Sequence, residues 1–134
     1  MAEPYFANQE VAANARRALE VREKAPRSQK GGTRVGTTRA NQMADGEPMS
    51  LRTVKRVLGY LSRHLVDKKG STWDAKGRGW QAWHLWGGDA AGPWAAAIVR
   101  RDDPVWWNRW VTGPRNRELA SALGFSAEPV TVKE

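Results

Sequence analysis

The sequence predicts an all-α protein: a compact bundle of short helices with a tryptophan-rich helical corner and extended termini. Apolar residues recur every three or four positions in several segments, which is the spacing of one helix face. The 13 glycines and 7 prolines divide the chain of 134 residues into short pieces. No segment alternates apolar and polar residues for long enough to predict a strand, and no internal repeat is present.

The length is that of one ordinary domain, which we divide into four parts. These are an N-terminal arm (1–10), a helical core domain (11–101), a C-terminal aromatic helical segment (102–125) and an extended tail (126–134). The first ten residues, MAEPYFANQE, are polar and acidic, unlike a secretory signal. No apolar run approaches the roughly 18 residues of a membrane span, so we expect no membrane partner.

In the first third of the chain we predict two helices joined by a loop. The segment 8–24 places Val11, Ala15 and Ala18 on one face, and Asn8 can cap its start. The stretch 25–36, APRSQKGGTRVG, is predicted to be a loop because it is polar and contains three glycines. A short helix is predicted to follow at residues 38–44 and to stop at Asp45-Gly46.

The most regular segment is 50–65, SLRTVKRVLGYLSRHL, which starts at Ser50, a good N-cap. One side of the predicted helix is apolar, and it comprises Leu51, Val54, Val57, Leu58, Leu61 and Leu65. Arginine and lysine occupy mainly the other side. Gly59 in the helix interior costs about 1 kcal/mol relative to alanine, so we expect a close helix contact there.

The stretch 79–94, GWQAWHLWGGDAAGPW, holds four of the eight tryptophans. It predicts a helix that ends at Gly87-Gly88, and a second helix that Asp89 would cap. We expect its indole rings to fill the corner between the two helices. The alternative is an exposed stacking platform for single-stranded nucleic acid, which would need exposed rings alternating with cations.

Two more short helices are predicted near the C-terminus. Asp103 and Pro104 give a cap and a proline suited to the first helical position, and they open the helix PVWWNRWV. The second helix covers 116–124. Aromatic residues and arginine are enriched in protein interfaces, so we assign one here. The candidate interface residues are Trp106, Trp107, Arg109 and Trp110.

The formal net charge of +8 indicates either a polyanionic partner or simply a solvated basic surface. Lysine and arginine can neutralise phosphates without sequence preference. The candidate polyanion contacts are Arg16, Arg17, Lys30, Arg34, Arg52, Lys55, Arg56, Lys68 and Lys69. The segment 50–64 could also serve as the recognition helix of a helix-turn-helix, to which the preceding short helix is a loose match.

No set of side chains predicts catalysis, a metal site or a cofactor site. The chain has no cysteine and two histidines, His64 and His84, so neither a thiolate site nor a zinc centre is expected. His84 lies between Trp83 and Leu85, where a packed histidine is more plausible than a general base. The aspartates fall at loops and helix starts, where helix capping explains them. We therefore expect a protein that is not an enzyme.

The segments ARRALEVREK, GGTRVGTTRANQMADGEPMSLRTVKRVLGYLSRHLVDKKG and GWQAWHLWGGDAAGPWA follow one another over residues 11–97. Their order resembles a small module encoded in tailed-bacteriophage genomes, alone or joined to head proteins such as portals and maturation proteases. The resemblance implies a phage-encoded structural protein located in the virion, and in the host cytoplasm before assembly. Its implied partners are capsid or neck proteins within a larger assembly. A basic DNA-binding protein of phage origin is the alternative.

Overall fold

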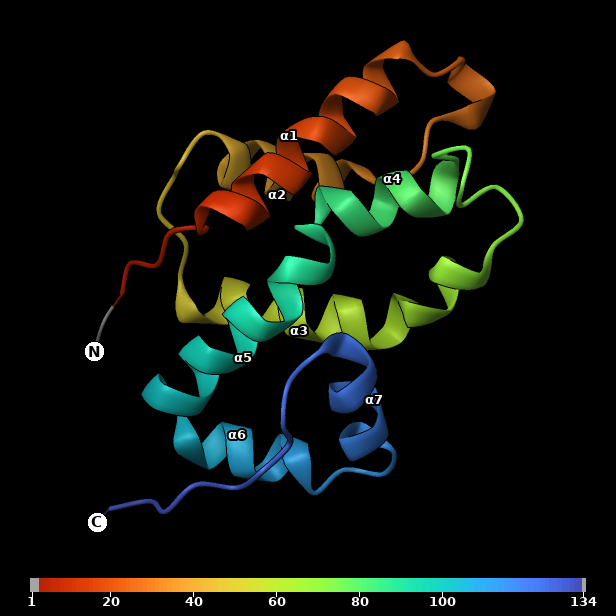
Figure 1. The fold of residues 1–134 in the computed structure, drawn as a ribbon. Coiled ribbons are helices and arrows are strands. Elements are labelled where there is room, and N and C mark those ends of the chain that lie inside the picture. The colour runs from red at the N-terminus through yellow and green to blue at the C-terminus, as the bar shows by residue number, and fades with distance from the viewer. Residues whose placement is uncertain (1–2, 134) are drawn as a thin grey trace.

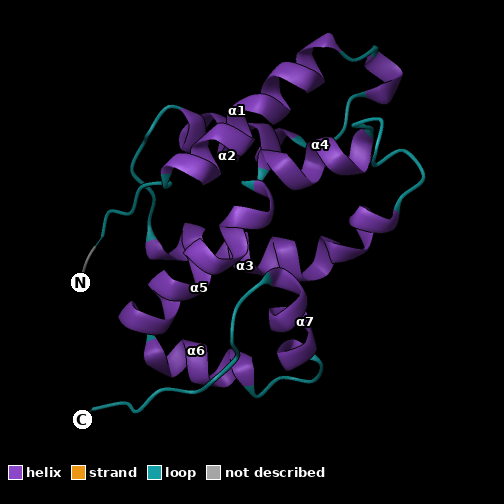
Figure 2. Ribbon diagram, in the orientation of Figure 1, coloured by secondary structure: helices purple, strands orange, loops and turns teal. Residues whose placement is uncertain are grey.

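The computed structural model describes residues 3–133 and shows an all-α protein. Within that range no strand forms, and a single antiparallel bridge joins Tyr5 to Met49 (Figure 2). Three short 3₁₀ turns lie at Arg27–Gln29, Leu65–Lys69 and Gly88–Ala90. The α-helices are α1 (Gln9–Lys24), α2 (Arg34–Ala44), α3 (Leu51–His64), α4 (Arg78–Leu85), α5 (Ala91–Asp102), α6 (Pro104–Val111) and α7 (Asn116–Leu123). The predicted fold class is confirmed.

The helices form two groups that share one core (Figure 1). In the first group α1 packs on α2 and α4, and in the second α3 packs on α5 and α7, with α6 against α5. The α4–α5 corner joins the groups, because it continues from the first into the second. Since α2 and α3 pack on different neighbours, they do not form the closely packed pair of a helix-turn-helix.

Three predicted helix starts are confirmed by their caps. The side chains of Asn8, Ser50 and Asp103 each accept a hydrogen bond from the backbone N–H three residues further along the chain. Such a bond satisfies one of the donors that every helix start leaves without an intrahelical partner. The local sequence therefore defines where α1, α3 and α6 begin.

Two other predictions about helix starts are wrong. Helix α2 begins at Arg34 rather than at residue 38, because Thr33 caps it by accepting a hydrogen bond from the N–H of Gly36 (3.2 Å). Asp89 does not cap α5, whose first turn follows a 3₁₀ turn and has no side-chain cap. The Asp89 carboxylate instead accepts a hydrogen bond from Nε1 of Trp83 (2.9 Å).

The glycines of α3 and of the α4–α5 corner differ in their surroundings. Gly87 has a φ of +101°, and a Cβ there would lie 2.8 Å from Cγ1 of Val11, so this glycine both stops α4 and lets α1 approach. The close helix contact expected at Gly59 is absent: a Cβ there would meet only Nη1 of Arg63, at 3.2 Å. Gly59 therefore has no packing role among the described residues.

The described parts of both terminal segments are extended, as predicted, and both are attached to the helices. Tyr5 and Met49 exchange two backbone hydrogen bonds, and the Tyr5 hydroxyl donates to Asp102 (2.7 Å). In the tail, Val130 exchanges two hydrogen bonds with the side chain of Asn108 (2.7 and 2.8 Å). The segment 102–125 contributes to the same buried core as residues 11–101.

Candidate functional site

The tryptophans of α4 and of its C-cap form core, as the sequence predicts. Trp80, Trp83 and Trp86 are buried, while Trp94 on α5 is half-buried. The His84 ring stacks on Trp80, with 4.1 Å between ring centroids, and Nδ1 lies 2.8 Å from the Trp80 carbonyl oxygen. Burial lowers the pKa of His84, which outweighs the hydrogen bond to Trp80 that raises it. The expectation of a packed histidine is confirmed.

Of the four candidate interface residues on α6, the prediction is wrong for Trp107, which is buried. Trp107 is 0% exposed, stacks on Trp110 and donates a hydrogen bond from Nε1 to the backbone oxygen of Glu128 (2.8 Å). Trp106 and Trp110 are half-buried, and only Arg109 of the four residues is exposed. The tail covers this aromatic surface, which the local sequence could not show.

Five of the nine candidate polyanion contacts already have partners within the protein. They are Arg16, Arg17, Lys30, Lys55 and Lys68. The first and third donate to backbone carbonyls, and the second lies over the Trp80 ring at 5.9 Å. The two other lysines form ion pairs with Asp103 (2.6 Å) and Asp89 (2.8 Å). Because these side chains already have partners within the protein, they are weaker candidates for contacts with an external anion.

The remaining four candidates are exposed, and their side chains form no hydrogen bond or ion pair with any residue of 3–133. They are Arg34, Arg52, Arg56 and Lys69. Arg52 and Arg56 lie on α3, and Arg63 continues their row on the same side, opposite the buried apolar stripe of this helix. We call Arg52, Arg56 and Arg63 the arginine face of α3. None of the three has a carboxylate partner in the described part of the chain.

Arg39 on α2 is a further arginine that the sequence does not single out as a candidate. It is 8% exposed, its guanidinium lies 5.5 Å from the Trp86 ring centroid, and Nη1 donates to Oε1 of Gln42 (2.6 Å). Burial lowers the pKa of Arg39, and the charge of Arg56 lowers it further. The helical register contained the signal, because Arg39 shares the buried face of α2 with Gly36, Ala40 and Met43.

A pocket of about 370 Å³ brings together parts of three separate motifs of the sequence. The Gly31-Gly32-Thr33 loop, His64 of α3 and Trp86 line it. The His64 ring stacks on Tyr60 at 4.1 Å, and its Nδ1 lies 3.4 Å from a carboxylate oxygen of Asp67. Burial, helped by the charge of Asp67, raises the pKa of Tyr60 to about 12, which keeps this phenol protonated. The Thr33 hydroxyl oxygen near this pocket caps α2, so it serves the fold.

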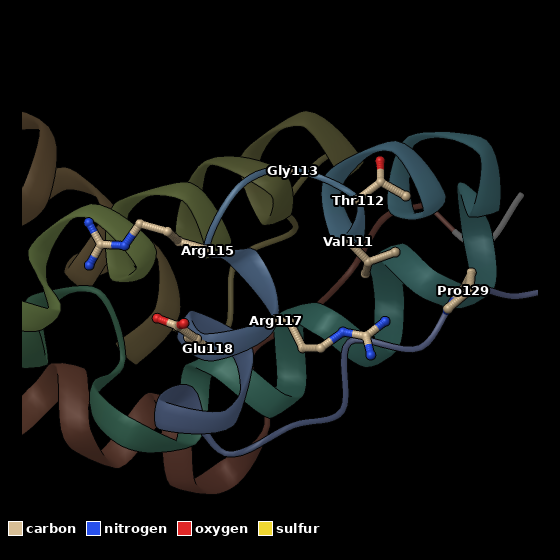
Figure 3. A pocket seen from close by; sticks show the side chains of 7 residues that line it. All are labelled: Val111, Thr112, Gly113, Arg115, Arg117, Glu118 and Pro129. Carbon is tan, nitrogen blue, oxygen red and sulfur yellow. The ribbon is translucent and has the colours of Figure 1, made fainter.

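A second pocket, of about 430 Å³, lies where the α6–α7 turn meets the tail (Figure 3). Arg115 of the turn and Arg117 of α7 extend in different directions in this view, and Glu118 contributes an opposite charge. Arg115 has a φ of +67°, which is uncommon for a residue with a side chain. The charges do not converge on one point, so this pocket does not form an anion site.

Among residues 3–133, no three histidine, aspartate or glutamate side chains are grouped so that they could hold a metal ion. None of the helices in that range combines the length and apolarity of a membrane span. Comparison with known proteins found no protein-family model, no curated protein and no solved structure that matches this chain. Because Arg52, Arg56 and Arg63 are exposed and have no carboxylate partner among residues 3–133, the arginine face of α3 is the best candidate functional site.

Proposed function

We propose that the protein is a non-enzymatic component of a phage virion that binds nucleic acid through the arginine face of α3. One observation carries the nucleic-acid part of this proposal. Arg52, Arg56 and Arg63 form a row of exposed positive charges on one rigid helix, with no carboxylate partner in residues 3–133. The phage part is supported by the resemblance of residues 11–97 to the phage module.

Exposed arginines can bind the phosphate backbone without contacting the bases. Lys and Arg that neutralise phosphates release condensed counterions, so the affinity falls steeply with salt concentration. Each neutralised phosphate of duplex DNA contributes about 0.9 to the slope of log K against log salt. From the three arginines of α3 we expect DNA binding that weakens with salt and does not depend on the DNA sequence.

The experiment measures binding of a fluorescent DNA duplex over a range of salt concentrations. In the test variant, Arg52→Gln, Arg56→Gln and Arg63→Gln are combined. The matched control combines Arg27→Gln, Arg100→Gln and Arg117→Gln, which are also exposed and remove the same charge. We expect the test variant to lose at least about tenfold in affinity and to show a salt slope shallower by about 3, and the control to lose less. Equal losses, or no binding by the natural protein at low salt, would rule out this role.

Contacts with capsid or neck proteins are a second candidate function. Trp106 and Trp110 are half-buried beside the exposed Arg109, and such residues can still contribute to a protein interface. Mass spectrometry of purified virions tests the virion location that both candidates share. Recovery of the protein at a fixed stoichiometry supports it, and absence of the protein from intact particles contradicts it.

A further inference from the structure

Arg39 is the one residue in 3–133 with a buried side-chain nitrogen that lacks a hydrogen-bond partner, the Nε atom. Nη1 is engaged by Gln42, whereas neither Nε nor Nη2 donates to a described residue. These two nitrogens form one edge of the planar guanidinium. Such an edge donates two parallel hydrogen bonds and matches the oxygen atoms of a phosphate group.

The charges around Arg39 also favour the binding of an anion. A buried cation without a counter-charge is unfavourable, because the protein interior solvates it less well than water. Arg56 adds a second positive charge near it, and no carboxylate pairs with either arginine in the described part of the chain. An oxyanion at this point would interact favourably with both guanidinium groups.

The position of the Arg39 guanidinium is supported by aromatic rings. It lies over Trp86, and Tyr60 stacks on the same indole with 4.5 Å between centroids and 8° between planes. Trp86 follows α4 and Tyr60 belongs to α3, so two elements hold the platform. A guanidinium whose orientation is fixed loses less conformational freedom when it binds an anion.

We propose that Arg39 of α2, together with Arg56 of α3, binds a phosphate group. The proposal rests on the proposed function for its source of phosphate, the backbone of a nucleic acid. Free inorganic phosphate has the same chemistry, so the site can be tested without DNA. Arg39 then differs from the arginine face in its role: it fixes one phosphate in place, whereas the exposed arginines attract the strand.

The first experiment compares the melting temperature of the full chain in inorganic phosphate and in sodium chloride of equal ionic strength. We expect phosphate to raise the melting temperature of the natural protein by about 3 °C or more. Arg39→Met should melt at a higher temperature than the natural protein in chloride, since it removes a buried charge, and should show no phosphate-specific rise. Arg56→Met, at an exposed position, should lose most of the rise, and the matched control Arg100→Met should keep it.

Phosphate also stabilises proteins by exclusion from their surface, and this effect would act on all four proteins alike. An equal rise in the natural protein and in Arg39→Met therefore overturns the proposal, as does a rise that survives Arg56→Met. A second measurement, DNA affinity, separates this site from the proposed function. A phosphate-specific rise without DNA binding supports the site and contradicts the proposed function. DNA binding without a phosphate-specific rise supports the proposed function and contradicts the phosphate site.

Discussion

The tryptophans of the α4–α5 corner and those of α6 are buried by different kinds of contact. In the α4–α5 corner, Trp83 is 1% exposed and donates its indole N–H to the side chain of Asp89, six residues away. On α6, Trp107 is 0% exposed and donates to the backbone oxygen of Glu128, 21 residues away. One indole is satisfied within its own motif, and the other depends on the tail.

This difference explains why the sequence predicts the burial of one group and not of the other. The Gly87-Gly88 stop turns the chain at the corner, so the neighbours of Trp83 follow directly in sequence. The segment PVWWNRWV contains no such turn toward a partner, and the same arginine and tryptophan composition is typical of an interface. In the sequence, a buried tryptophan cannot be distinguished from an interface tryptophan unless the segment that covers it is known.

The largest expected effect tests the burial of Trp107. Trp107→Ala should lower the free energy of unfolding by about 3–5 kcal/mol, because it leaves a cavity in the core and removes the stacking on Trp110 and the tilted ring contact with Phe125. Urea denaturation measures the change. Trp106→Ala, at a half-buried position of the same helix, is the control and should cost clearly less. If the two variants lose the same stability, α6 is not packed as described.

The next effect separates the two hydrogen-bond partners. Asp89→Ala removes the acceptor of the buried Trp83 N–H and should cost about 1–3 kcal/mol. Glu128→Ala keeps the backbone carbonyl that Trp107 uses, so it should change the stability by no more than about 0.5 kcal/mol. Chemical denaturation of both variants checks the contrast. Similar costs for the two substitutions would mean that the Glu128 side chain contributes as well.

Acid should weaken the attachment of the N-terminal arm. Hydrogen bonds from Arg101 and Tyr5 hold the pKa of Asp102 at about 2, below its ordinary value of 3.8. A carboxyl with a lowered pKa in the folded state stabilises the protein above its unfolded pKa, and this contribution is lost as the pH falls from about 4 to 2. The melting temperature should drop in this range, and Asp102→Asn should drop less. Identical pH profiles would exclude Asp102 as the source.

Asp89, in the α4–α5 corner, contributes to the pH dependence of stability in the same direction as Asp102. Burial raises its pKa, but hydrogen bonds from Lys68 and Trp83 outweigh burial, so the pKa lies below the ordinary value. Its contribution is therefore also lost in acid. The double variant Asp89→Asn with Asp102→Asn should show a flatter pH profile than Asp102→Asn alone, in the same thermal measurement.

The smallest expected effect is a gain in stability. Gly59→Ala should raise the free energy of unfolding by about 0.5–1 kcal/mol, because alanine favours the helix and the nearby end of the Arg63 side chain can move. Gly92→Ala in α5 is the matched control, and it should be destabilising because its Cβ would lie 3.0 Å from the backbone oxygen of Leu123. Urea denaturation of both variants should give changes of opposite sign.

Much of the fold follows from local chemistry that is visible in the sequence. The caps Asn8, Ser50 and Asp103, the stop at Gly87 and the apolar stripe of α3 each act within a few residues. Capping bonds and helix periodicity are short-range effects, so the sequence by itself determines which segments are helical and where most of them begin. The start of α2 is an exception, because its cap, Thr33, lies in a glycine-rich stretch that the sequence predicts to be a loop.

The candidate site is a different matter, because it depends on which segments meet. The sequence identifies the arginines of α3 as a basic face, but only the tertiary structure shows that Lys55 and Lys68 are paired with distant carboxylates. It also places Arg39 over Trp86 with an unused edge. Whether a charge or an indole is available to a partner is decided by long-range contacts, which local sequence does not encode.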